Sequence, residues 1–215
     1  MIDKGWIRIL GSGSEKLNRG LGEWNKGKTF KNYGDQPTHF LIADDIIGGY
    51  FALNAGGIGR ELGKVYYLPQ DTLKWECLDI GYSEFLYWAL TGDVHGFYEL
   101  FRWKNWERDI QTANGNQVFS FVPFLWTEEG KDIENTCRSL VPVEENYHLT
   151  LDFQQQFDVN HIARLDVRLC WFGWFRSNVF YVQPHQYRNK KRYDPDQADH
   201  ASQGHERYAD ADGVG

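Results

Sequence analysis

The sequence predicts an α+β domain in which helices pack against a mostly antiparallel sheet, and two features predict it. The first is a set of three short runs at 40–43, 50–53 and 65–68, rich in β-branched, aromatic and aliphatic residues and bounded by turn formers. The second is a pair of apolar segments at 85–90 and 94–101, the latter with helical spacing. The three runs indicate a β-meander, and the two segments indicate helices that cover it.

Glycines separate the three predicted strands. Gly48 and Gly49 allow a tight reversal that side chains would obstruct. In the next connection, Gly57, Gly59 and Gly63 superficially resemble a phosphate-binding loop. Such a loop needs a helix directly after it, and the strand that follows leaves no room for one. A turn between two strands is therefore the better interpretation.

The flanking elements are predicted from the same patterns. An alternating stretch at 6–10 indicates a first strand, and the similar stretch at 73–78 indicates a strand after the meander. Residues 11–28 are rich in glycine, serine and charge and are expected to form a loop with about one helical turn. Ser83 and Asp93 are expected to cap the two helices, because short polar side chains satisfy the free N–H groups there.

The second half of the domain is less regular. The run at 118–125 contains Pro123, which favours a sheet edge. Residues 126–139 are polar and are expected to be irregular. Pro142 is expected to open a last helix that reaches about Phe157.

Composition changes after this helix and predicts three parts. Residues 1–158 are expected to form the α+β domain, and residues 159–186 an irregular apolar extension that forms one or two strands or stays exposed. Residues 187–215 are polar, lack apolar periodicity and are expected to be disordered.

Charge and cysteine content limit the classes of function and the compartment that we expect. The net charge of −7 argues against nucleic-acid binding, which needs clustered Lys and Arg. The cysteines Cys77, Cys137 and Cys170 form no Cys-x-x-Cys pair and are odd in number, so we expect them to be reduced and the protein to be cytoplasmic. No apolar run is long enough for a membrane span or a signal peptide, so no membrane partner is expected.

No catalytic residue, metal site or cofactor is predicted. His39, His95 and His148 lack metal-ligand spacing. The adjacent acids in the chain would point to opposite faces of a strand, so they are poor candidates for a catalytic pair. Whether the protein is an enzyme is left open, with a non-enzymatic role favoured.

Two tryptophans in polar segments and several acids suggest a binding surface. The simpler interpretation of the acids is that they are solvated turn residues. The sharper one is that they converge on an acidic surface edged by exposed aromatic rings, which often mark binding sites. The residues expected on this partner-binding surface are Trp24, Asp44, Asp45, Trp126, Glu128, Glu129 and Asp132.

Several long segments resemble a known family. They are GWIRILGSG, FLIADDIIGGYFALN, GKVYYLPQDTLKWECLDIGYSEFLYWALTGDVHGFYELFRW and FSFVPFLWTEEGKDIE. Over about residues 2–157 they are similar to the bacterial DUF2625 proteins, a family without an assigned function. FLIADDIIGGYFALN and the YSEFLYWAL helix more distantly resemble the SUKH superfamily. Family members carry sequence ahead of GWIRIL and lack a counterpart after Asn160, so Met1 is expected to be an internal or misassigned start and the end a shifted frame or a fusion.

The SUKH resemblance implies a fold and a function. It implies helices against an antiparallel sheet, and a protein-binding role, with a toxin as one candidate partner because many bacterial members are immunity proteins. An acidic aromatic surface would suit a basic toxin. The alternative is an uncharacterised enzyme, or a binder of a small ligand such as a sugar or peptide, that uses an aromatic cleft between the sheet and residues 126–139.

Overall fold

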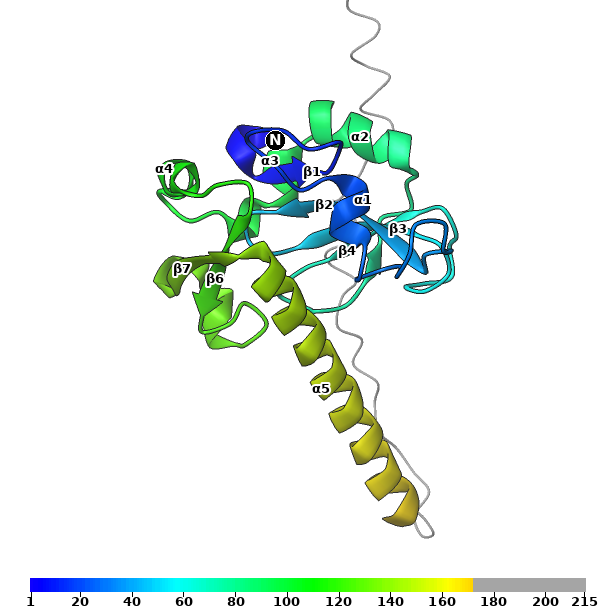
Figure 1. Cartoon of the computed structure of the whole chain (residues 1–215). Helices are drawn as coiled ribbons and strands as arrows, with labels where there is room; N and C mark the ends of the chain where they lie inside the picture. The colour runs from blue at the N-terminus through cyan, green and yellow to red at the C-terminus, as the bar shows by residue number, and fades with distance from the viewer. Residues whose placement is uncertain (172–215) are drawn as a thin grey trace, which may run out of the picture. The chain divides into compact units, whose positions relative to one another are not determined.

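The structure of the protein is a computed structural model that describes the backbone of residues 1–171 and the side chains of residues 1–157. Its central element is a five-stranded antiparallel sheet in the order β1-β2-β3-β4-β5 (Figure 1). The strands are β1 (Ile7–Ile9), β2 (His39–Asp45), β3 (Tyr50–Asn54), β4 (Val65–Leu68) and β5 (Glu76–Cys77). The predicted meander and its flanking strands are thus present, and the fold is α+β as expected.

The turn between β2 and β3 needs its two glycines. Gly48 has a φ of +86°, in the region that favours glycine. A Cβ atom on Gly49 would collide with Oδ2 of Asp45 and lie 2.5 Å from the hydroxyl of Tyr67. The turn therefore brings the backbone close to a buried carboxyl group, a constraint that goes beyond the expected tight reversal.

Two helices follow the sheet in sequence, α2 (Tyr82–Thr91) and α3 (Val94–Phe97). Helix α2 starts after Gly81, whose N–H donates to Glu84, rather than at the expected Ser83. Asp93 caps α3 as expected and accepts from the N–H of Gly96 at 2.8 Å. The helical stripe predicted over 94–101 is broken, because α3 ends and a 3₁₀ turn, Glu99–Phe101, takes over.

Both faces of the sheet are covered. On one face, Phe51 and Tyr67 stack on each other, with ring centroids 4.5 Å apart, and Phe85 of α2 packs against Phe51 at 5.0 Å. On the other face, Tyr50 packs against Tyr147 of the last helix at 4.9 Å. Neighbouring residues of β3 serve opposite faces because side chains alternate along a strand. Two short helices lie beside the sheet: Asn25 of α1 (Leu21–Asn25) donates to the backbone oxygen of Leu41 on β2, and Trp106 of α4 (Trp106–Asp109) packs against Trp6, next to β1, at 5.1 Å.

A second, two-stranded sheet was only half expected. Strand β6 (Gln117–Val122) matches the predicted edge strand, but β7 (Cys137–Pro142) lies in the part expected to be irregular and pairs antiparallel with β6. Pro142 ends this strand instead of opening the helix. The β7 residues are exposed or half-buried, so their hydrophobic pattern is weak, and the pairing with β6 determines the strand.

Helix α5 (Val143–Trp171) leads away from both sheets (Figure 1). It continues past the expected end near Phe157, so residues 165–171 are helical rather than strands. The predicted extension after residue 171 and the tail at 187–215 lie outside the described residues. Among the helices of the described part, none combines the length and the apolar character that a membrane crossing requires.

Candidate binding surface

Asp44 and Asp45 end strand β2, and both residues are 0% exposed. Asp44 forms ion pairs with two arginines, Arg8 at 2.5 Å and Arg19 at 2.6 Å. Arg8 lies on the neighbouring strand β1 and is 1% exposed. Such a buried charge is tolerated only when it is paired and hydrogen-bonded, as it is here.

The two arginines also join the two sheets. The guanidinium of Arg8 donates to the backbone oxygens of Gln117 and, at 2.9 Å, of Asp45. Arg19 donates to the backbone oxygen of Gly115 at 2.8 Å. Together Arg8, Arg19, Asp44 and Asp45 form what we call the charged centre. It fixes the start of β6 against the edge of the five-stranded sheet.

Asp45 points to the opposite face from Asp44, as alternation along a strand requires. One carboxylate oxygen accepts the N–H groups of Gly49 at 2.7 Å and Ile47 at 3.1 Å, and the other accepts the hydroxyls of Tyr67 at 2.6 Å and Tyr98 at 2.9 Å. Burial raises the pKa of Asp45 above its usual value, although the hydrogen bonds and the Arg8 charge act to lower it. The residue organises the β2–β3 turn from inside.

Trp24 is also in the interior. It belongs to α1 and is 5% exposed, and its ring centre lies 4.5 Å from the guanidinium carbon of Arg19 and 4.0 Å from the ammonium of Lys28. Trp24, Asp44 and Asp45 therefore do not form an exposed surface, which corrects the expectation for these three residues. The interpretation of Asp44 and Asp45 as solvated turn residues is wrong for the same reason.

The other four expected residues lie at or near the surface, in one segment. Trp126 is half-buried, and Glu128, Glu129 and Asp132 are exposed. The hydroxyl of Thr127 donates to the backbone oxygen of Phe124, and a Cβ on Gly130 would collide with that same oxygen. The turn that carries the acids is thus folded tightly onto the residues before Trp126.

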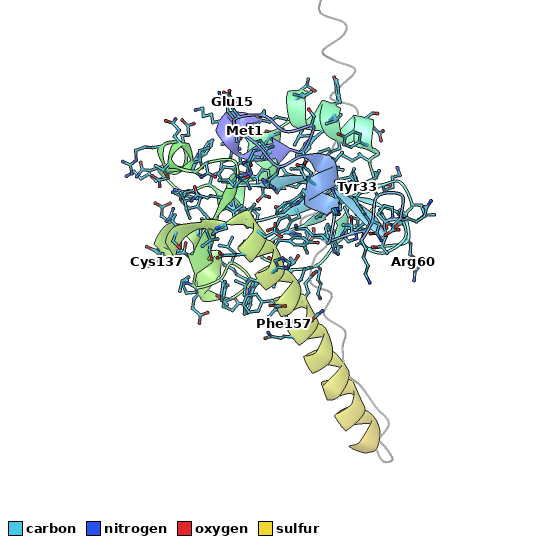
Figure 2. All side chains as sticks on the ribbon, viewed as in Figure 1. Met1, Glu15, Tyr33, Arg60, Cys137 and Phe157 are labelled. Carbon is cyan, nitrogen blue, oxygen red and sulfur yellow. The ribbon has the colours of Figure 1, made fainter. Side chains whose placement is uncertain are left out.

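Trp126 belongs to a cluster of aromatic rings that α5 completes. Its ring centre lies 5.5 Å from Phe124, 5.6 Å from Phe153 and 5.0 Å from Phe157. Phe157 is 41% exposed and nearby Leu149 is 39% exposed. Figure 2 shows Phe157 on α5 where the helix leaves the sheets, far from the loop of Arg60. We call Phe124, Trp126, Leu149, Phe153 and Phe157 the aromatic patch.

A small cavity lies beside the aromatic patch. It measures about 20 Å³, and Phe124, Trp126, Leu149 and Phe153 line it together with four polar side chains, those of Gln70, Ser120, Asn146 and Thr150. Gln70 Nε2 donates to Thr150 at 3.0 Å, and Asn146 accepts the Tyr50 hydroxyl at 2.9 Å. A cavity of this size has room for about one water molecule. It is smaller than a site for a sugar or a peptide side chain in this conformation.

Sequence reasoning missed the helical half of the patch. Phe153 and Phe157 are four residues apart on the expected helix, so they share one face, and this spacing is the signal that could have found them. No comparable local signal exists for Arg8 and Arg19. Their pairing with Asp44 joins residues 36 and 25 positions apart.

Titratable and metal-binding groups add little to this surface. Within the described residues, no set of three or more His, Cys, Asp and Glu side chains is placed to hold a metal ion. Burial lowers the pKa of His39. Cys77 and Cys137 are exposed free thiols. The predictions of no metal, no cofactor and no catalytic residue stay predictions.

Comparison with known proteins gives a consistent result. A protein from Haemophilus influenzae, described as uncharacterized, is 45% identical over 159 residues, which are 74% of this chain and 70% of that protein. The putative uncharacterized protein YbfG of Escherichia coli K12 is 40% identical over 157 residues, 73% of this chain and 69% of its own length. No solved structure matches the chain.

The family comparison covers most of the folded part. The model of the family described as "Protein of unknown function DUF2625" matches residues 1–146, from the first strand to the beginning of α5. It includes the charged centre, Trp126 and the acidic turn, and ends before Leu149, Phe153 and Phe157. This chain belongs to the DUF2625 family.

Proposed function

We propose that the chain is a non-enzymatic protein-binding domain and that the aromatic patch is its contact surface. The observation that carries the proposal is that large apolar side chains cluster where α5 leaves the sheets, with Phe157 41% and Leu149 39% exposed. Clustered exposed apolar side chains of this kind often mark sites of protein interaction. Aromatic side chains are also frequent among the residues that dominate binding energy.

The patch is ordered before any partner arrives. Its rings lie on two supports, helix α5 and the segment after β6, and pack on one another with centroids 5.0–6.4 Å apart. A surface that is already rigid loses less conformational entropy on binding. This organisation supports a docking surface more than it supports the alternative, a small-ligand or enzyme cleft, for which the adjacent cavity of about 20 Å³ offers little room.

The more specific role is an immunity-type protein that neutralises a toxin in the bacterial cytoplasm. The support is the distant SUKH resemblance and the exposed free thiols of Cys77 and Cys137, which suit a reducing compartment. A toxin gene next to the gene for this chain would support the role. Survival of cells that express such a toxin, restored by this chain and lost with Trp126→Ala, would test it directly.

Site-specific crosslinking tests the binding surface. A photoreactive phenylalanine analogue replaces Phe157 in the full chain, and a matched control carries it at Tyr87, which is 55% exposed on α2. In living cells we expect one discrete crosslinked protein from position 157 and not from position 87, identified by mass spectrometry. Equal crosslinking from both positions, or none from 157, would contradict the proposed surface.

A further inference from the structure

We infer that the aromatic patch takes a positively charged segment of its partner, one in which lysines or arginines flank a large apolar side chain. The inference rests on the proposed function, because it concerns the same surface. It adds the chemical class of the partner, and it is drawn from the charges that surround the patch rather than from the buried Asp44 and Asp45.

The first group of charges is on helix α5. Glu145 and Asp152 are exposed, and they lie four residues before and three residues after Leu149. Residues three and four apart are neighbours on a helix surface, so these two carboxylates flank Leu149 on the same face. Within the described side chains neither has an ion-pair partner.

The second group is on the turn after Trp126. Glu128, Glu129 and Asp132 are exposed, and the turn is packed against Phe124 and Leu125, as the close approach of Gly130 shows. Glu128 pairs with Lys131 at 2.6 Å. Glu129 has no ion-pair partner among the described residues, so the turn keeps a net negative charge beside the rings.

The basic side chains near the patch have partners among the described residues. Lys131 pairs with Glu128 within the turn. Arg138 lies over the ring of Trp103 at 4.7 Å, and Lys28 lies over Trp24 and pairs with Glu144 at 2.8 Å. An apolar patch edged by carboxylates that have no ion-pair partner among the described residues favours a cationic partner, because unlike charges attract at long range and like charges are rejected. Among the other surfaces, the loop of Arg60 exposes one large apolar side chain, Leu62, beside exposed charges of both signs, Arg60 and Glu61.

Two synthetic amphipathic helical peptides test the inference with the full chain. Both have the same leucine positions, and their polar positions are all lysine in one and all glutamate in the other. We expect the lysine peptide to bind at least tenfold more tightly by calorimetry, and its affinity to fall as salt is raised. Trp126→Ala should weaken it, because the rings supply the apolar contact.

A matched pair of charge-reversal variants separates local from general attraction. One variant, Glu129→Lys with Asp152→Lys, reverses two of the exposed carboxylates that edge the aromatic patch and form its rim. The other variant, Glu15→Lys with Glu99→Lys, makes the same change in net charge at exposed positions outside the patch. Figure 2 shows Glu15 at the opposite end from Phe157. The preference for the lysine peptide should collapse in the first variant and persist in the second.

The outcomes test the charge preference separately from the existence of the binding surface. Equal binding of both peptides, abolished by Trp126→Ala, would overturn the inferred charge preference and leave the binding surface standing. Equal effects of the two charge-reversal variants would overturn the inference as well, because the attraction would then come from net charge. No binding of the lysine peptide also overturns it, while the crosslinking at Phe157 judges the proposed function separately.

Discussion

The charged centre and the aromatic patch reverse the usual distribution of polar and apolar groups. In the charged centre, Asp44 and Asp45 are fully buried, whereas the patch leaves Phe157 41% exposed. The two regions differ in the groups that their side chains contact. The Asp44 and Asp45 carboxylates accept from arginines, tyrosines or backbone N–H groups, while the rings of the patch pack on one another and leave Phe157 partly exposed.

This contrast assigns stability to one region and recognition to the other. Removing one member of a buried ion pair is strongly destabilising, so the charged centre stabilises the contact between the two sheets. Exposed aromatic rings add little to folding and are available to another molecule. Reversing Asp44 and Asp45 to lysine would therefore disrupt the fold and would say nothing about binding.

Asp44→Ala gives the largest effect that the comparison predicts. The change leaves Arg8 and Arg19 buried or nearly buried without their shared carboxylate. We expect the free energy of unfolding to fall by about 3–5 kcal/mol, the usual result of removing one member of a buried ion pair. Urea denaturation followed by tryptophan fluorescence measures it.

The control for this variant is Glu129→Ala, at an exposed acid of the patch rim. A surface substitution of this kind changes stability by about 0.5 kcal/mol or less. Comparable losses in the two variants would show that the charged centre is no more important for folding than the surface acids, and would remove the contrast.

Much of the fold could be predicted, because it depends on local patterns. The runs at 40–43, 50–53 and 65–68 and the glycines between the first two are visible in sequence, and each lies in a strand or turn of the structure. Strand β7 and the start of α2 could not, because the strand depends on pairing with β6 and the helix start on the backbone N–H of Gly81.

The candidate surface was predictable only in part. Trp126 and the three acids of its turn lie at or near the surface, since a polar segment with turn residues is seldom buried. In the sequence, Trp24 and Asp44 also stand beside polar residues. In the fold both are buried, and Arg19, which is distant in sequence from Asp44, contacts both of them. Burial of a charge depends on distant partners, and a single sequence does not reveal these.

A pH titration probes the charged centre at Asp45. Burial raises the pKa of Asp45 in the folded state. A raised pKa means that the folded protein binds the proton more tightly, so this stability is fully present below the unfolded pKa and is lost as the pH rises through the folded pKa. A tenfold difference in proton affinity between the folded and unfolded states corresponds to about 1.4 kcal/mol of stability.

The measurement compares the natural chain with Asp45→Asn, which does not titrate at this position. Urea unfolding at increasing pH from about 4, the ordinary pKa of an aspartate, should show the natural chain losing stability relative to the variant. A relative gain with rising pH would mean that the four hydrogen bonds and Arg8 outweigh desolvation, and that Asp45 is held as a carboxylate.

The smallest effect is expected at the patch itself, from Phe157→Ser. This ring is partly exposed and touches Trp126 and Phe153 from one side, so the free energy of unfolding should change by less than about 1 kcal/mol. For comparison, truncation of a fully buried ring in the core, Phe85→Ala, should cost about 3–5 kcal/mol. A loss above about 2 kcal/mol for Phe157→Ser would place the ring in the core and deprive the patch of its function in recognition. A small loss would mean that the fold does not need this ring for its stability. A side chain kept for contact with a partner should behave in this way.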